Sequence, residues 1–233
     1  IQAILEGFKD DLPRYKPKKQ LKVQHDEQLM VCYPVGDHHI GMLSDDSETG
    51  KNYNLDIAEE IISGSIDYLV ETAPNSEKAT LIFLGDFLHF DNMTPVTQSG
   101  NNLDASGRYP RVVKYAIRCM RYLVDSALKK HEKVHVIIEI GNHDLSSSIF
   151  LQQCLDNVYE KEERITVDTS PSHYHYFKHG QNLVGVHHGH GAKMNQLPLI
   201  MAADKPDLWG SSKYRYWYTG HVHHDQVKDF HGT

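Results

Sequence analysis

The amino-acid sequence predicts an α/β protein in which packed sheets are flanked by helices. Short apolar runs typical of buried strands alternate with longer segments whose apolar residues recur at helical spacing. Several of these runs end in polar turns that contain glycine. Strand-like segments dominate the second half of the chain, so we expect mixed strand directions there.

The first half of the chain repeats a strand-helix-strand pattern. The predicted elements are a strand at 29–35, a helix at 55–70, a strand at 79–84, a helix at 112–128 and a strand at 134–140. The polar turns after the three strands are Gly36-Asp37, Gly85-Asp86 and Gly141-Asn142-His143-Asp144. This repetition predicts a sheet whose strand ends gather their polar residues at one edge.

The second half is predicted to add a hairpin of segments 174–177 and 182–187 around Gly180, and a strand at 214–219 that ends at Gly220-His221. Residues 1–28 are expected to form a short helix and a basic linker interrupted by prolines, and residues 29–233 a single domain. Because the chain begins with Ile1 and stops soon after its last motif, we expect it to be part of a longer protein that is truncated at its C-terminal end.

The composition is that of a globular protein, with 39% hydrophobic and 24% charged residues. No apolar run approaches the roughly 18 residues of a transmembrane helix, and no secretory signal pattern opens the chain, so we expect a cytoplasmic protein without a membrane partner. Cys32, Cys119 and Cys154 are predicted to be reduced core thiols. The formal charge of -7 argues against a broad nucleic-acid-binding surface but permits a local basic groove.

The chain contains 17 histidines, concentrated in a few short segments, whereas scattered ones such as His25, His131 and His179 are expected at the surface. Five predicted strand ends carry clusters of polar residues: Asp37 with His39, Asp86, Asn142 with His143, His187 with His188, and His221 with His223. All but His143 are candidate metal ligands. Carboxylate, amide oxygen and imidazole together suit manganese, iron, zinc or nickel.

The spacing of these residues predicts which of them share an ion. Alternate residues of an extended segment point to the same side, so Asp37 and His39 are expected to bind one ion, as are His221 and His223. A single Gly-Asp after a strand is more often an ordinary turn than a ligand. The prediction of a metal site therefore depends on the joint occurrence of metal-binding residue types at five strand ends of one chain.

Taken in order, these blocks resemble the signature of the calcineurin-like metallophosphoesterases, over about residues 30 to 224. The matching segments are Asp37-His38-His39, Gly85-Asp86, Gly141-Asn142-His143-Asp144, His187-His188-Gly189-His190 and Gly220-His221-Val222-His223. The resemblance implies a four-layer α/β/β/α sandwich with two mixed sheets flanked by helices. It also implies two bound divalent metal ions, of which manganese is favoured, with iron, zinc, nickel or magnesium as alternatives.

The resemblance implies a ligand set for each ion. The first set is Asp37, His39, Asp86 and His223, and the second is Asp86, Asn142, His188 and His221. Asp86 would then bridge the two ions. His188 is preferred over His187 and His190 as the ligand because the family places this ligand immediately before a glycine, although the other two remain alternatives.

The implied reaction is hydrolysis of a phosphate ester by a water molecule activated between the two ions. By resemblance, His143 contacts the phosphate or acts as general acid for the leaving oxygen, and Asp144 orients the His143 ring. Asn142 and His190 are expected to contact the substrate as well.

The block Gly85-Asp86-Phe87-Leu88-His89 departs from the Gly-Asp-x-x-Asp-Arg-Gly of protein serine/threonine phosphatases. It resembles the Gly-Asp-Leu-Phe-His of the phosphoesterase nuclease of double-strand-break repair, which implies that His89 assists catalysis. The alternative is that His89 only packs beneath the site. The leading hypothesis is therefore a phosphodiesterase or DNA nuclease of the repair-exonuclease type.

DNA as the substrate would require cations beside the metals, and we expect Arg108 to bind substrate phosphate. Other cations near the motifs are Arg111, Lys193, Lys213 and Arg215. The aromatic residues of segment 214–218 could stack on bases, but we expect them to be mainly structural because half of a strand faces the core.

Two alternatives to a nuclease stay open. The net acidity and the lack of an obvious DNA-capping domain favour a phosphatase or pyrophosphatase of a nucleotide or other small phosphorylated molecule. A non-catalytic scaffold on the same fold would be expected to have lost ligand residues, and this chain retains every block. An additional domain or a protein partner is also expected.

Overall fold

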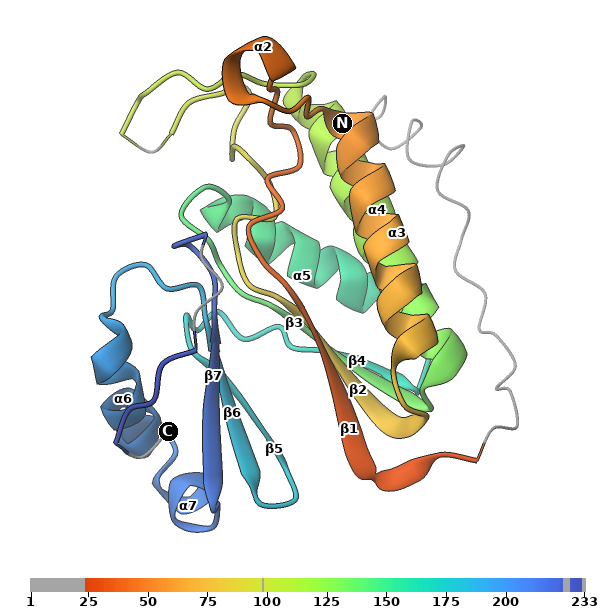
Figure 1. The fold of residues 1–233 in the computed structure, drawn as a ribbon, viewed down its shortest axis with the longest axis vertical. Coiled ribbons are helices and arrows are strands. Elements are labelled where there is room, and N and C mark those ends of the chain that lie inside the picture. Colours follow the sequence, from red (N-terminus) through yellow and green to blue (C-terminus); the bar gives the residue numbers. More distant parts are fainter. Residues whose placement is uncertain (1–23, 98, 224–226, 232–233) are drawn as a thin grey trace.

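The structure is a computed structural model that describes residues 24–97, 99–223 and 227–231 (Figure 1). Most of the predicted helix and linker of residues 1–28 lies outside these residues. Asp26, Glu27 and Gln28, which were predicted to belong to the linker, instead form the start of the first strand. The linker prediction is therefore wrong at its C-terminal end.

The first sheet contains four strands in the order β1-β2-β3-β4, all parallel. Its strands are β1 (Asp26–Val35), β2 (Ser76–Phe83), β3 (Lys133–Ile138) and β4 (Ile165–Val167). Consecutive strands are joined by α3 (Leu55–Thr72), α4 (Tyr109–Lys130) and α5 (Leu145–Tyr159), and a short α2 (Asp46–Thr49) precedes α3. Each crossover helix returns the chain to the same end of the sheet. The expectation of mixed directions in both sheets is therefore wrong for the described strands of this sheet.

The second sheet has the order β5-β6-β7 and mixed directions, as predicted for the second half of the chain. Its strands are β5 (His175–His179), β6 (Asn182–His187) and β7 (Tyr214–Thr219). β5 and β6 form an antiparallel hairpin around Gly180, which adopts a positive φ of 55°. β7 runs parallel to β6 because η1 (Met194–Gln196), α6 (Leu197–Asp204) and α7 (Pro206–Gly210) form the crossover between them.

The core has two parts because successive residues of a strand face opposite sides of the sheet. Leu81 and Phe83 of β2 belong to the large cluster that includes residues of α3, α4 and α5. Ile82, between them, joins a smaller cluster with Ile137 of β3 and Val186 of β6. The helices therefore pack against one face of the first sheet and the second sheet packs against the other (Figure 1). Burial on both faces explains why β2 and β3 read as continuous apolar runs.

α5 was not predicted, since polar residues occupy part of its buried face. Ser147, Ser148 and Gln152 are buried beside Leu151 and Leu155, so the apolar spacing is interrupted. The Gln152 side chain donates from Nε2 to the Ile138 carbonyl at 2.7 Å, which satisfies part of its buried amide. Interactions of this kind leave no periodic signal in a sequence.

His131 is buried at the end of α4, so the expectation that it lies at the surface is wrong. Its Nδ1 donates to the Ser76 carbonyl at 3.0 Å, and its Nε2 lies 2.7 Å from the Tyr33 hydroxyl. The three cysteines are free thiols, as predicted, although only Cys119 is fully buried. In the part of the chain that the structure describes, no helix is long and apolar enough to cross a membrane.

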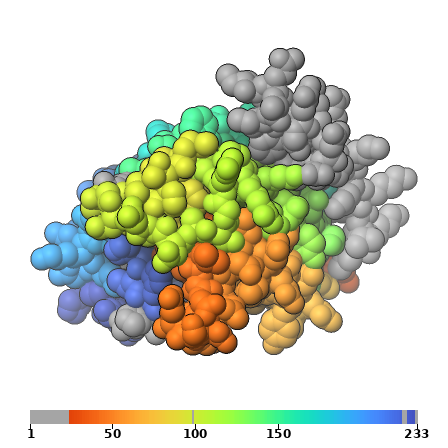
Figure 2. Space-filling model, turned by 90° about the horizontal axis from the view of Figure 1, so that it is seen from above, coloured from red at the N-terminus to blue at the C-terminus, as the bar shows by residue number. Residues whose placement is uncertain are grey.

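Loops at the carboxyl ends of the first sheet's strands form one end of the molecule. Residues 40–55 lie side by side there with segments 90–97 and 99–110, as Figure 2 shows from above. Backbone bridges join Met42 to Ala105 and Ser44 to Tyr53. These loops surround the strand ends at which the candidate ligands lie.

Candidate metal centre

The predicted site residues converge although they come from five strand ends far apart in the sequence. Among the described residues, three groups offer ligand atoms that all lie within 4.8 Å of one another. The groups are Asp37 with His39 and His223, Asp86 with His188 and His221, and His39 with His89 and His143. Every predicted metal ligand except Asn142 belongs to one of the first two groups.

The backbone at these positions is unusual. Five residues other than glycine have a positive φ in the described part of the chain, and all five are predicted ligands: Asp37, His39, Asp86, His221 and His223. Their φ values lie between 46° and 70°, in the left-handed region that side chains with a Cβ disfavour. Left-handed residues of this kind concentrate at functional sites, where the surrounding structure holds them in place.

The glycines of the motifs are required by close approach. A Cβ on Gly85 would lie 2.6 Å from His188 Nδ1, and a Cβ on Gly220 would lie 2.8 Å from Asp37 Oδ2. A Cβ on Gly141 would lie 2.1 Å from the Asp86 backbone nitrogen. Glycine precedes these ligands because the strand ends pack together more tightly than any side chain allows.

Asp37 and His223 anchor the first group. The backbone N–H of His221 donates to both carboxylate oxygens of Asp37, at 2.9 and 3.0 Å, which fixes the β7 end beside the β1 end. Asp37 Oδ1 lies 3.4 Å from His223 Nε2. His39 is buried, and burial lowers its pKa to about 3, so its ring is neutral and can act as a ligand.

The second group is arranged around His188, which is fully buried. Its Nδ1 donates to the Leu84 carbonyl at 2.7 Å, so Nε2 carries the lone pair in the neutral ring. That Nε2 lies 3.1 Å from Asp86 Oδ2 and 3.0 Å from Asn142 Oδ1. Asn142 therefore joins this group as its fourth member, as the resemblance implies.

The electrostatics of the second group favour positive charge. Burial opposes protonation of His188, but the Asp86 carboxylate outweighs it and raises the pKa of His188. Burial raises the pKa of Asp86, yet His188 and the backbone N–H of His143 outweigh it and lower that pKa to about 2. These shifts show that the Asp86 carboxylate favours a positive charge beside it, which a proton on His188 or a bound cation would supply.

His221 and His223 belong to different groups, so the expectation that they share an ion is wrong. The expectation assumed an extended segment, in which alternate side chains point the same way. Both residues instead have left-handed φ values, so the segment is not extended and the rule of alternating sides does not apply to it. Asp37 and His39 share a group as expected, although their segment is not extended either.

The structure brings His188 into the second group, and His187 and His190 into none. His187 donates from Nδ1 to the His173 carbonyl at 2.8 Å, on another side of the strand end. His190 lies beside the group, with ring centroids 5.3 Å from His188 and 6.2 Å from His221. Its position is compatible with the predicted substrate contact.

The third group places His89 and His143 beside His39. The His89 and His143 rings stack with centroids 5.7 Å apart, and His89 Nδ1 lies 3.4 Å from His39 Nδ1. His143 Nδ1 donates to the His89 carbonyl at 2.9 Å, so its Nε2 is left for another partner. Burial and the neighbouring His143 lower the pKa of His89 to about 4.

Asp144 does not orient the His143 ring, so that prediction is wrong. Its buried carboxylate accepts the backbone N–H groups of Gly141 at 3.1 Å, Asp86 at 3.2 Å and Leu88 at 3.0 Å. Burial raises the pKa of Asp144 to about 6. This side chain therefore holds the loops after β2 and β3 together and positions Asp86.

Sequence reasoning missed Asp91. Its carboxylate accepts the backbone N–H of Ser146 at 2.8 Å and of Ser147 at 2.7 Å, and so caps α5 from another loop. It ties the segment that carries His89 to the helix that follows His143. An acidic residue two positions after a motif histidine carries no recognisable signal of this role.

The basic residues are less concentrated at the centre than expected. Arg108 is exposed at the residue before α4. Arg215 donates to the carbonyls of Trp209 and Ser212, and Arg111 packs on Tyr115. The expectation that segment 214–218 is mainly structural agrees with the packing of Trp217 against Tyr174 and Tyr176.

Comparisons with protein-family models, with curated proteins and with solved structures found no match to this chain.

Proposed function

We propose that this protein is a phosphoesterase of the calcineurin-like type that depends on two divalent metal ions. The observation that carries the proposal is the convergence of two neighbouring groups of ligand atoms from four strand ends, each with a carboxylate and imidazoles, with Asn142 joining from a fifth strand end. Five left-handed ligand residues in the same place support it, since strain of this kind concentrates at functional sites.

The proposed fold is the four-layer α/β/β/α sandwich of that family. The packing of the second sheet against the face of the first sheet opposite α3, α4 and α5 supports this proposal. So does the position of α6 and α7, which lie beside the second sheet away from the first in Figure 1.

The first ion would be held by Asp37, His39, Asp86 and His223, and the second by Asp86, Asn142, His188 and His221. The donor set fits borderline divalent cations, with manganese as the leading choice and iron, zinc, nickel or magnesium as alternatives. When bound, two such ions supply Lewis-acid polarisation of the phosphate and a water of lowered pKa.

The chain's own contribution to the reaction is positioning and proton transfer. His143 belongs to neither of the first two groups, and its Nδ1 is bound to the His89 carbonyl. In the neutral ring Nε2 presents a lone pair, whereas in the imidazolium form Nε2 carries the second proton and donates it to the leaving oxygen. Asp144 and Asp91 hold the loops that carry Asp86, His89 and His143.

We propose a phosphodiester, and DNA in particular, as the substrate. The position of His89, stacked on His143 and in contact with His39, supports a catalytic role as in the repair-nuclease resemblance. Hydrolysis of a nucleotide or another small phosphate ester is the second candidate. The formal net charge of -7 favours this candidate, because a broad nucleic-acid-binding surface would be basic.

A substrate screen tests the proposal. The purified chain with Mn²⁺ is assayed on single-stranded DNA, bis-p-nitrophenyl phosphate and nucleotides. We expect Asp86→Ala to lose the metal of the candidate centre and to lose activity. His143→Ala should keep its metal content and lose about 10²- to 10⁴-fold in turnover, the usual contribution of a general acid.

His179→Ala is a matched control, because His179 lies on β5 and contacts the Gln28 carbonyl, away from the centre. It should leave metal content and turnover unchanged. Hydrolysis of nucleotides but not of either diester would overturn the nuclease assignment, as would a His89→Ala variant that cleaves DNA at the parental rate. Full hydrolysis by the Asp86→Ala variant would overturn the two-metal proposal itself.

A further inference from the structure

A second set of ionisable side chains is buried behind the candidate metal centre, between the two sheets. Glu139 directly follows β3 and is fully buried. His175, at the start of β5, is buried on the side that faces it. Asp168 and His173 complete the set, and none of the four was singled out in the sequence.

Three buried polar atoms of this set have no hydrogen-bond partner of ordinary geometry, namely both carboxylate oxygens of Glu139 and His175 Nε2. The backbone N–H groups of Ile140 and His188 make only weaker interactions with the Glu139 carboxyl group. Buried polar atoms in folded proteins are nearly always satisfied, and a buried carboxylate without a partner is destabilising. Glu139 Oε2 and His175 Nε2 face each other, so either a shared proton or a further positive group belongs between them.

The orientation of the His175 ring narrows the identity of that group. Its Nδ1 lies 2.8 Å from Asp168 Oδ2, so Nδ1 carries the proton and Nε2 presents its lone pair toward Glu139. A carboxylate that fixes a histidine in this way is the usual outer partner of a metal-binding imidazole. Two acceptors, Nε2 and Glu139 Oε2, then face each other, an arrangement that a cation between them would stabilise.

One pair of atoms in this set has the spacing of two ligands of a metal ion. His175 Nε2 and Glu139 Oε2 lie 3.3 Å apart. Two ligand atoms at about 2.0 to 2.2 Å from a tetrahedral zinc ion are separated by roughly 3.4 Å. His173 Nδ1 lies 3.9 Å from Glu139 Oε1, and its side chain is 47% exposed, so it can turn toward the ion and offers a route from solvent.

The geometry points to a separate cation site in which Glu139, His173 and His175 bind one borderline divalent ion such as Zn²⁺, with Asp168 as the outer carboxylate. Two imidazoles and a carboxylate are a donor set for ions of this class. This site goes beyond the proposed function, since it shares no ligand with either group of the candidate centre.

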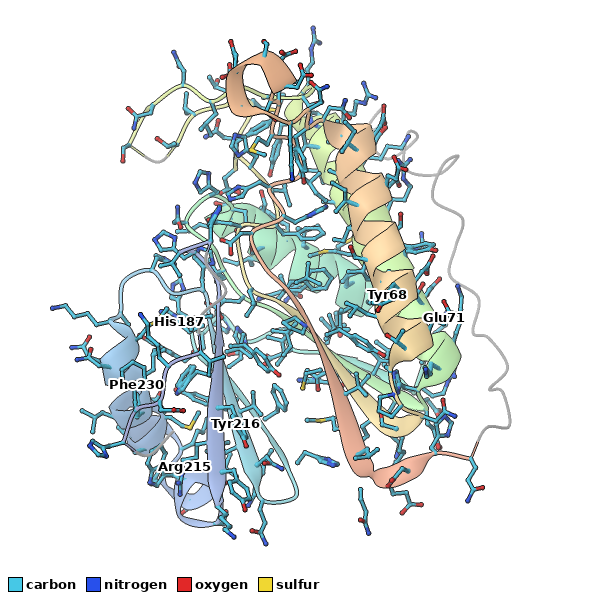
Figure 3. All side chains as sticks on the ribbon, in the orientation of Figure 1. Tyr68, Glu71, His187, Arg215, Tyr216 and Phe230 are labelled. Atoms are coloured by element: carbon cyan, nitrogen blue, oxygen red, sulfur yellow. The ribbon has the colours of Figure 1, made fainter. Side chains whose placement is uncertain are left out.

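The site would join the two sheets. Glu139 lies three residues before Asn142, and His175 pairs in the β5-β6 ladder with Val186, two residues before His188. Figure 3 labels His187, the residue between them, at the upper end of the second sheet. An ion held here would link β3 to β5 and so stabilise the relative position of the loops that carry Asn142 and His188.

Metal stoichiometry tests this inference. The full chain is stripped with a chelator, equilibrated with Zn²⁺, desalted and analysed for metal per chain. We expect three ions in the wild type, two in His175→Ala and one in an Asp86→Ala/His188→Ala variant. His179→Ala removes a histidine from the same strand and should retain three.

The outcomes separate this site from the candidate centre. Equal metal content in the wild type and His175→Ala would overturn the inference and indicate that Glu139 and His175 share a proton instead. One ion in the wild type and none in His175→Ala would support this site while overturning the two-metal proposal.

Asp168→Asn provides a test that does not disturb the core, since the Asp168 side chain is 24% exposed. We expect about 10- to 100-fold weaker Zn²⁺ binding at one site, the usual effect of removing an outer partner. Zn²⁺ should also raise the melting temperature of the Asp86→Ala/His188→Ala variant but not after His175→Ala is added. Unchanged affinity in Asp168→Asn would contradict the site even if His175→Ala fails to fold.

Discussion

The same substitution, glycine to alanine, should have opposite effects at two positions of this chain. At Gly141 an added Cβ would lie 2.1 Å from the Asp86 backbone nitrogen and 2.2 Å from Asp86 Oδ1. It would also lie 2.7 Å from Asp144 Oδ1. The loop after β3 must therefore move away from Asp86. At Gly64, inside α3, nothing lies within 4 Å of the added Cβ.

The magnitudes follow from these contacts. Overpacking at Gly141 costs about 1 to 3 kcal/mol. Separating the His143 N–H from the Asp86 carboxylate, now 2.7 Å apart, adds about 1.5 to 3 kcal/mol for a bond to a charged group. Gly64→Ala should instead stabilise the protein by about 0.5 to 1 kcal/mol, because alanine restricts the unfolded chain and favours the helix.

Thermal unfolding of the chelator-treated protein checks both signs without interference from bound metal. For a domain of this size, 1 kcal/mol corresponds to about 2 to 4 °C. We expect Gly141→Ala to melt about 5 °C or more below the wild type and to lose metal at the second group. Gly64→Ala should melt about 1 to 4 °C above it with unchanged metal content. A Gly141→Ala variant that keeps wild-type stability and metal content would refute the reasoning from close approach.

Three further predictions concern residues around the centre and the core. Asp91→Ala should destabilise the protein by about 0.5 to 2 kcal/mol through loss of the α5 cap, and it should lower turnover. Asp91→Asn should restore part of the stability and part of the turnover. Equal denaturation midpoints for Asp91→Ala and the wild type would contradict this prediction. Asp144→Asn should cost about 1 to 3 kcal/mol in urea unfolding, because an amide cannot accept all three backbone N–H groups, and an unchanged midpoint would count against that role. Burial lowers the pKa of His131, so the unfolded state binds the proton more tightly than the folded state does. The stability that the neutral ring provides is therefore lost as the pH falls below the ordinary pKa of histidine. Between pH 7 and 5 the free energy of unfolding should depend less steeply on pH in His131→Gln than in the wild type, and identical slopes would exclude this contribution.

β2 and β3 could be predicted because residues buried on both faces produce unbroken apolar runs, and α3 and α4 could be predicted from apolar residues at helical spacing. The strand ends of the candidate centre could be located as well, because a polar turn that directly follows an apolar run marks the end of a strand. The division of His221 and His223 between two groups could not be derived from spacing, because it depends on left-handed backbone angles.

Tertiary contacts of single polar residues account for most of what the sequence did not predict. Asp144 was assigned to its neighbour His143, whereas it binds the backbone of loops after two strands. Glu139 did carry a signal that went unused, namely a charged residue between Ile138 and Ile140 in a buried run. His131 reads as a polar helix end, and only the packing of β1 and β2 against it explains its burial.

The left-handed ligand residues have a consequence for how this protein can change over time. Each such residue holds of the order of 1 kcal/mol or more in unfavourable backbone energy, more for the histidines than for the aspartates. Glycine at His39, His221 or His223 would release that energy while removing a donor atom. Selection for heat resistance alone should therefore favour substitutions at these ligand residues first. A laboratory lineage evolved without an activity screen would gain thermal stability while it loses metal binding and activity.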